Sequence, residues 1–231
     1  MPARPPSPAI EGLLRDLGSN IRRGAGPAAA LNRCPTGLPG IDRMLGGGFP
    51  RGRLSEITGP VCCGRTSLAL ALLAGTTALG EVVALVDDAD AFDPPSAAAA
   101  DVDLRRVLWV RTSERHHALR SSEQLLAARR FALVLLDLAA DQKRPASIPS
   151  SAWSRLRKTA ASTDTALVVL GDRRLAGIFA DLAIEMSDAE PRFRGAPSLL
   201  EGLEGRVQLI RNRTGPHECA VAVRWQSASA A

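Results

Sequence analysis

Apolar runs and helical stretches alternate along most of this chain. Continuous apolar runs predict strands buried on both faces at 81–87, 131–137 and 165–171. Shorter strands are expected at 53–58 and 106–111, each close to a turn or loop signal. Helical segments separate these strands, at 41–45, 65–79, 96–101, 119–129 and 150–162.

This order of strand, helix and strand predicts right-handed βαβ units and therefore a parallel sheet. The last part of the chain differs, because strands at 181–187, 205–211 and 217–225 have no helix between them. We expect the stretch 188–204 to be irregular and the late strands to pair antiparallel. The predicted fold class is α/β, a central mostly parallel sheet flanked by helices with an antiparallel C-terminal extension.

Both ends of the chain differ in composition from the middle. Residues 1–8 are rich in proline, and residues 9–23 space their apolar side chains as a short amphipathic helix does. We therefore expect a flexible N-terminal segment with this helix at 1–33, a core domain at 34–226 and a disordered tail at 227–231.

A glycine-rich loop follows the strand at 53–58 and precedes the most apolar helix. Residues 59–66 read GPVCCGRT, which fits the spacing G-x-x-x-x-G-[K/R]-[S/T] of a phosphate-binding loop in the required strand–helix context. The glycines allow a tight turn that points backbone N–H groups at a phosphate. The candidate nucleotide-binding residues here are Gly59, Pro60, Val61, Cys62, Cys63, Gly64, Arg65, Thr66 and Ser67.

Two further features of this motif decide what it can bind. Arg65 stands where lysine is the rule, and its longer, planar guanidinium would neutralise phosphate in another geometry. Thr66 would offer its hydroxyl to Mg²⁺, and Asp137, at the end of a buried strand, stands where a carboxylate holds that ion's shell. ATP and Mg²⁺ are therefore the indicated cofactors. The alternatives are a vestigial loop that has lost its ligand and an Asp137 that caps a turn.

The net charge and the aromatic content bear on whether the chain binds nucleic acid. Net charge is +5, with arginines near both ends of the chain, which permits contact with DNA through a basic surface. The alternative explanation of the many arginines is a GC-rich genome, which encodes arginine in place of lysine. Aromatic residues make up only 3% of the chain and tyrosine is absent, so a stacking platform for bases is not expected.

The reactive side chains suggest a reducing compartment. No C-x-x-C pair occurs among the cysteines, so a zinc site built on them is not expected. Reduced thiols, a cytoplasmic location and no membrane contact are the simplest expectation, since no apolar run approaches the roughly 18 residues of a membrane helix. His116 and His117 suggest a surface turn, because no acidic or cysteine partner at ligand spacing is apparent.

Longer runs resemble the RecA family. TGLPGIDRMLGGGFPRGRLSEITGPVCCGRTSLAL resembles the RecA segment that leads into its phosphate loop, and FALVLLDLA resembles the strand with its metal-binding carboxylate. GRVQLIRNRTGPHECAVAVRW resembles late RecA strands and a basic pair. The resemblance covers roughly residues 35–226. It implies that Arg211 and Arg213 contact the nucleotide of a neighbouring subunit, although a solvated basic turn is the alternative.

The departures from RecA concern its ATPase chemistry. The catalytic glutamate position falls on Ala89 in VDDADAFDP, and alanine cannot activate water. Asp88 or Asp90 could substitute, but each is one position off. The tyrosine that stacks on adenine corresponds to Ser96, and the polar γ-phosphate sensor corresponds to Gly171. We therefore assign no catalytic residue and expect no enzymatic activity.

A RecA core with such a site resembles the ImuA group, also described as SulA-like or RecA-like accessory proteins of translesion synthesis. That resemblance implies a non-catalytic adaptor in SOS-induced, error-prone DNA synthesis. The implied partners are an ImuB-type relative of Y-family polymerases, an error-prone DNA polymerase III alpha subunit and RecA. Two alternatives are a weak DNA-dependent ATPase or recombinase and a SulA-type inhibitor of cell division.

Overall fold

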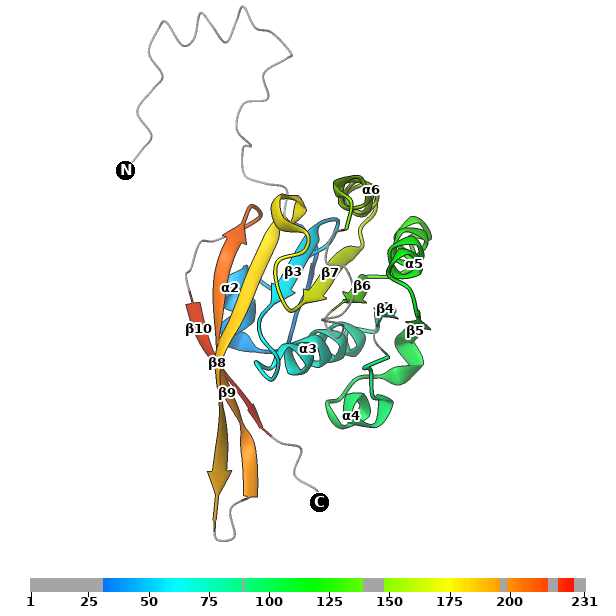
Figure 1. The fold of residues 1–231 in the computed structure, drawn as a ribbon. Helices are drawn as coiled ribbons and strands as arrows, with labels where there is room; N and C mark the ends of the chain where they lie inside the picture. Colours follow the sequence, from blue (N-terminus) through cyan, green and yellow to red (C-terminus); the bar gives the residue numbers. More distant parts are fainter. Residues whose placement is uncertain (1–30, 89, 139–147, 196–198, 216–219, 227–231) are drawn as a thin grey trace, which may run out of the picture. The chain divides into compact units, whose positions relative to one another are not determined.

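The computed structural model describes residues 31–88, 90–138, 148–195, 199–215 and 220–226 (Figure 1). The helix expected at 9–23, the tail at 227–231 and Ala89 lie outside the described residues. Arg33, assigned above to the N-terminal segment, pairs in a two-residue strand β1 (Arg33–Cys34) with β2 (Phe49–Pro50). Its guanidinium also donates to the carbonyls of Leu45, Gly48 and Thr214, so it is anchored to the core.

Within the described residues, eight strands form one sheet in the order β10-β9-β8-β3-β7-β6-β4-β5 (Figure 1). The pairs from β8 to β5 are parallel, whereas β9 and β10 are antiparallel to their neighbours. The predicted α/β class, with a mostly parallel sheet and an antiparallel extension, is confirmed. The strands are β3 (Leu54–Thr58), β4 (Val83–Asp87), β5 (Val107–Arg111), β6 (Leu133–Asp137), β7 (Ala166–Gly171), β8 (Leu182–Arg194), β9 (Leu199–Asn212) and β10 (Ala220–Gln226).

Helices cover both faces of the sheet and enclose a separate apolar core on each. On one face, α2 (Pro39–Leu45), α3 (Arg65–Ala78) and α4 (Pro94–Ala99) bury side chains such as Leu72 against alternate residues of the central strands. On the other face, α5 (Arg115–Ala127) and α6 (Ser150–Ala161) do the same with Trp153. Because alternate strand residues point to opposite faces, runs that are apolar throughout can feed both cores.

The prediction of an irregular stretch at 188–204 is wrong, because most of it extends β8 and β9 into a long hairpin (Figure 1). Register shifts after Ala183, Ser187 and Arg192 break the two-residue alternation by which a strand is recognised. Glu204 of β9 is bridged by arginines of both neighbouring strands, Arg192 at 2.6 Å and Arg224 at 3.4 Å. None of the described helices is long and apolar enough to cross a membrane.

Candidate functional site

The predicted phosphate loop lies between β3 and α3, at the carboxyl edge of the sheet. Gly59 has φ +152°, and a Cβ there would lie 2.5 Å from the carbonyl oxygen of Met186. Gly64, at the N-cap of α3, has φ +89°, a conformation that costs other residues free energy. The loop therefore has the turn that the motif requires, and both glycines are needed to form it.

Arg65 turns back across this loop instead of reaching into solvent. Its Nη1 donates to the carbonyl of Gly59 at 2.6 Å and to that of Gly171 at 2.5 Å. Gly171 is the last residue of β7, so the guanidinium ties the loop to the neighbouring strand. The cation at the lysine position is thus engaged by the chain's own backbone.

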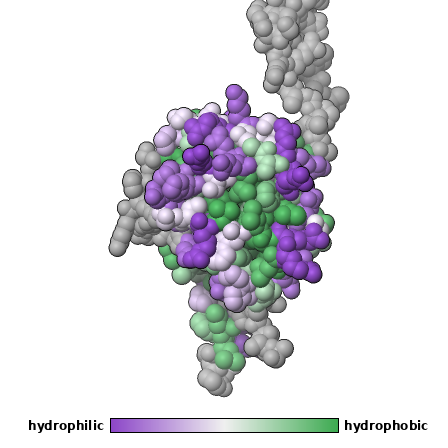
Figure 2. All heavy atoms as spheres, turned by 90° about the vertical axis from the view of Figure 1, so that its right-hand side faces the viewer, coloured by the Kyte–Doolittle hydropathy of each residue, from purple (hydrophilic) through white to green (hydrophobic). Residues whose placement is uncertain are grey.

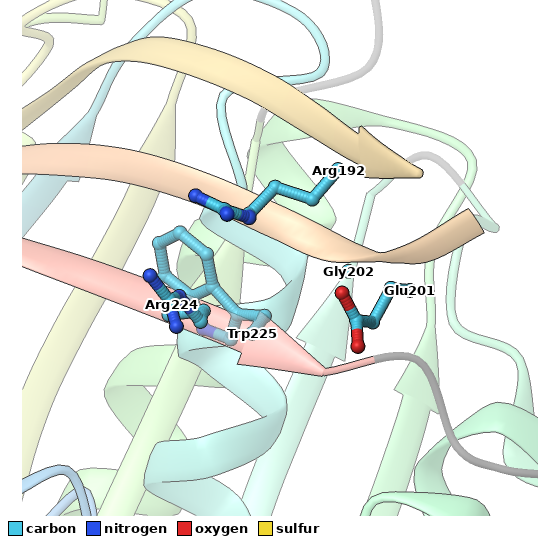
Figure 3. Close-up of a pocket in the computed structure, with 5 residues that line it drawn as sticks. All are labelled: Arg192, Glu201, Gly202, Arg224 and Trp225. Carbon is cyan, nitrogen blue, oxygen red and sulfur yellow. The ribbon is translucent and has the colours of Figure 1, made fainter. Parts of the chain in front are cut away.

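Trp225 of β10 packs against the same loop. A Cβ on Gly64 would lie 3.0 Å from the Trp225 ring, and one on Gly205 would lie 3.2 Å from it. The Trp225 Nε1 is buried and has no hydrogen-bond partner among the described residues. Trp225 lies beside Arg224 (Figure 3). Both line a small cavity of about 80 Å³ together with residues of β8 and β9. The ring closes one side of the phosphate loop.

The two candidate magnesium ligands reach the same edge of the sheet. Thr66 is exposed in the first turn of α3, and Asp137 ends β6, with β7 between β6 and β3. Asp137 lies opposite Asp87 in the register of β4 and β6, and its carbonyl accepts from the Asp88 N–H at 3.2 Å. The loop follows β3 and the carboxylate ends β6, two strands away at the same edge, and their roles toward nucleotide and Mg²⁺ stay a prediction.

Asp87 organises the chain after β4. Its carboxylate is buried and accepts hydrogen bonds from the backbone N–H groups of Ala91 and Phe92, at 3.1 and 3.0 Å. It also accepts from Trp109 Nε1 at 3.2 Å, and the Trp109 ring meets Phe92 edge to face. Asp87 is therefore a structural carboxylate that fixes the backbone of Ala91 and Phe92 after β4.

Asp88 and Asp90, the two residues that could substitute for the RecA glutamate, are each paired with an arginine. Asp88 is buried, with its Oδ2 3.5 Å from Arg115 Nε. Asp90 pairs with Arg111 at 2.5 Å. Its backbone is in the left-handed region, with φ +54°. An arginine partner at this distance fixes the orientation of the carboxylate and occupies one of its oxygens. Both groups are thereby made poor candidates for activating water.

Glu56 is a buried residue that the sequence analysis missed. Its Oε1 accepts from the backbone N–H groups of Leu175 and Ala176, at 2.5 and 2.8 Å, and so fixes the short segment after β7. Its Oε2 has no hydrogen-bond partner among the described residues. Burial raises the pKa of Glu56. The available signal was an acidic residue in the middle of the strand LSEIT.

Stability should therefore fall as Glu56 ionises. Because its folded pKa lies above its ordinary value of 4.5, Glu56 contributes stability that is full below that pH and is lost as pH rises through the folded pKa. In Glu56→Gln, which cannot ionise, this loss should be absent. Urea unfolding of both chains from about pH 4.5 to 8 measures it. A wild-type advantage that grows with pH would contradict the assignment.

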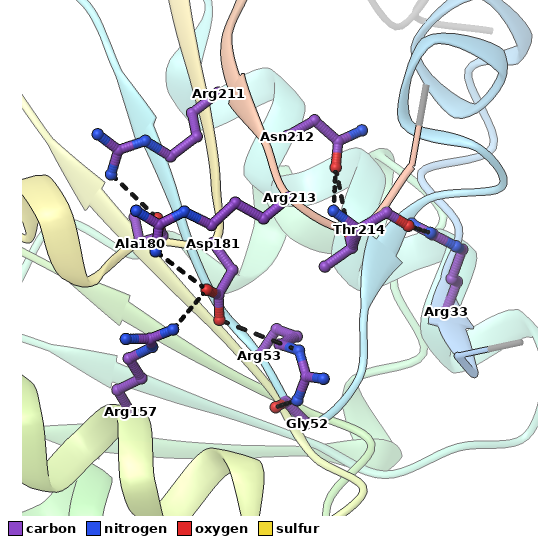
Figure 4. Close-up of polar contacts among 10 residues, drawn as sticks. All are labelled: Arg33, Gly52, Arg53, Arg157, Ala180, Asp181, Arg211, Asn212, Arg213 and Thr214. Carbon is purple, nitrogen blue, oxygen red and sulfur yellow. Dashed lines mark hydrogen bonds and ion pairs between the residues drawn. The ribbon is translucent and has the colours of Figure 1, made fainter. Parts of the chain in front are cut away.

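Arg211 lies opposite Ala183 near the start of β8, at the amino edge of the parallel strands, whereas the phosphate loop lies at their carboxyl edge. Figure 4 shows Arg211 beside Ala180 and Arg213 beside Asp181. Buried Asp181 binds Arg157 at 2.8 Å, Arg213 at 3.7 Å and Arg53 at 4.0 Å. Arg211 donates to the carbonyls of Gly177 and Ala180, at 2.8 and 3.2 Å. Burial, helped by the charge of Arg213, lowers the pKa of Arg211.

Comparison with known proteins agrees with this geometry. The RecA N-terminal domain family matches residues 10–151. Protein RecA of Picosynechococcus sp. is 34% identical over 138 residues, which cover 57% of this chain and 40% of that protein. The chloroplastic DNA repair protein recA homolog 1 of Arabidopsis thaliana is 32% identical over 135 residues, 56% of this chain and 31% of its own length.

The chain thus spans less than half the length of these curated relatives. The crystal structure of the RadB recombinase has the same fold, with a TM-score of 0.64 at 21% identity, covering 82% of this chain and 94% of that one. Sheet order, phosphate loop and sequence matches agree, and this chain belongs to the RecA family.

Proposed function

We propose that this chain is a non-catalytic RecA-type adaptor in SOS-induced, error-prone translesion synthesis. The observation that carries the proposal is Arg65, whose Nη1 binds the carbonyls of Gly59 and Gly171. A cation engaged in this way has to break two hydrogen bonds before it can neutralise a triphosphate. Hydrolysis also needs a base positioned to activate water. Asp88 and Asp90 are instead held by ion pairs with Arg115 and Arg111, which supports a non-catalytic role.

The site fits nucleotide binding better than nucleotide hydrolysis. The backbone of Gly59–Ser67 has the turn that would hold phosphates, and Thr66 and Asp137 would hold Mg²⁺. Bound Mg²⁺ would supply charge neutralisation to the phosphates. Arg65 does not fit the lysine's role as a compact charge between phosphates. We therefore propose at most a structural nucleotide.

The partners follow from the resemblance and from the placement of the basic pair. An ImuB-type Y-family relative and an error-prone polymerase III alpha subunit are the partners proposed for a protein of this group. RecA is proposed as a third, because Arg211 and Arg213 lie too far round the sheet to serve the chain's own phosphate loop. In the proposed complex they would contact the nucleotide of another molecule, once Arg211 has released the carbonyls of Gly177 and Ala180 and Arg213 has released Asp181.

Two assays on the full chain test the adaptor role. In the first, the chain is mixed with purified ImuB-type protein, polymerase alpha subunit and RecA, with and without ATP and single-stranded DNA. Capture of at least one partner should occur without ATP and persist in Arg65→Ala. In the second, phosphate release with DNA should stay at background for both the wild type and Arg65→Ala.

The outcomes separate the alternatives. Saturable, DNA-stimulated phosphate release that Arg65→Ala abolishes would establish the ATPase instead of the adaptor. Failure to capture any of the three partners would overturn the adaptor proposal. Arg213→Ala serves as the matched variant for RecA, because it removes one arginine of the pair while Asp181 keeps Arg157 and Arg53. It should weaken capture of RecA and leave the other two partners unaffected.

A further inference from the structure

Metal-binding side chains gather at the start of α5. Glu114 occupies the N-cap position, and His116 and His117 follow in the first turn. The His116 Nδ1 lies 3.1 Å from the Glu114 Oε2, and the two imidazole centroids are 3.9 Å apart. One ligand atom from each residue lies within 4.8 Å of the others. The expectation that the histidines lack an acidic partner is therefore wrong.

This donor set suits one class of ion. Two imidazoles and a carboxylate are ligands that Zn²⁺ takes at about 2.0–2.2 Å, and donors separated by 3.1 Å can share such an ion. We propose that Glu114, His116 and His117 form a surface site for a divalent transition metal of the Zn²⁺ class. Three protein donors leave the fourth tetrahedral position open to water or to a donor from another molecule.

The nearby charges permit a cation. Arg115, between the ligands in sequence, turns inward to Asp88 and to the carbonyl of Leu138 and is mostly buried. Its charge is neutralised within the fold and does not face the imidazoles. Arg120 and Arg111 line a groove with His117, and Arg155 lines one with His116, so these three arginines are the cations that oppose binding. The Glu114 carboxylate offsets part of their charge.

The test is calorimetric titration of the full chain with ZnCl₂. Cys62→Ser is used as the background, because its exposed thiol is a competing ligand. One ion per chain should bind. His116→Ala and His117→Ala should each weaken binding by more than about tenfold, since even loss of an outer-sphere partner costs about that much. Glu114→Gln should weaken it as well.

The matched control is His217→Ala, which removes the remaining histidine of the sequence. It should leave the affinity for Zn²⁺ unchanged. The three ligands are exposed, so each variant should unfold at the wild-type temperature, and this is checked by circular dichroism. Absence of Zn²⁺ binding would overturn the proposal. So would binding that survives both His116→Ala and His117→Ala, or binding that His217→Ala abolishes.

Discussion

Replacing Asp87 by alanine should lower the free energy of unfolding by about 3 kcal/mol, because each hydrogen bond to a buried carboxylate is worth about 1.5–3 kcal/mol. The substitution removes the acceptor of three donors, the N–H groups of Ala91 and Phe92 and the Trp109 Nε1. Phe92 and Trp109 pack against the core, whereas Ala91 is exposed, so water offsets only part of the loss and the total stays below the sum of three full bonds. Urea unfolding followed by circular dichroism measures it.

Asp87→Asn is the matched control. It keeps the shape and one acceptor oxygen, so its loss should be about half that of alanine. Tryptophan fluorescence should also change in the alanine variant, because the Trp109 indole, one of three in the chain, loses its partner and its edge-to-face contact with Phe92 loosens. A loss below about 1 kcal/mol in Asp87→Ala would show that the turn after β4 is held by other contacts.

Replacing Arg65 by alanine should lower the free energy of unfolding by about 2 kcal/mol. The buried carbonyls of Gly59 and Gly171 lose their donor, and the phosphate loop is released from β7. Part of the cost is offset, because the loop is half exposed and water can replace the guanidinium. Hydrogen exchange should therefore rise in the loop before the rest of the fold is affected.

Arg65→Lys separates charge from geometry. Its ammonium can donate more than one hydrogen bond, but its side chain is one bond shorter than the path to the arginine Nη1. It should therefore reach the two carbonyls less well and recover about half of the stability. Full recovery by lysine would mean that charge alone holds the loop. An unchanged free energy of unfolding in Arg65→Ala would remove the main support for the view that Arg65 is held by the carbonyls of Gly59 and Gly171.

The buried strands and the helices between them could be predicted from the sequence, because their hydrophobic patterns are local. Apolar runs such as 133–137 and 166–171 are buried on both faces, and the helices between them fall within a few residues of their predicted bounds. The phosphate loop was found because glycine spacing alone specifies its turn, through Gly59 and Gly64. These features depend on neighbouring residues, which a sequence displays directly.

The remaining features depend on residues far apart in the chain. The β8–β9 hairpin escaped detection because bulges shift its register, and only the pairing across strands shows the alternation. The bond from Arg65 to Gly171 joins positions 106 residues apart, and the packing of Trp225 on Gly64 joins opposite ends of the core. Glu56 could be suspected from its apolar surroundings, but not its partners in the segment after β7.

The phosphate loop and the basic pair lie at opposite edges of the sheet, so the molecule has two unlike surfaces. Any complex in which Arg211 and Arg213 approach the loop of another RecA-type molecule joins unlike surfaces, and is head-to-tail. Repetition of such a joint produces a polar stack with two different ends. If the proposed contact forms, a copy of this chain, whose own loop is engaged by Arg65 and Trp225, would contact a neighbour through its basic edge but not through its loop. It would therefore end the stack at one side only.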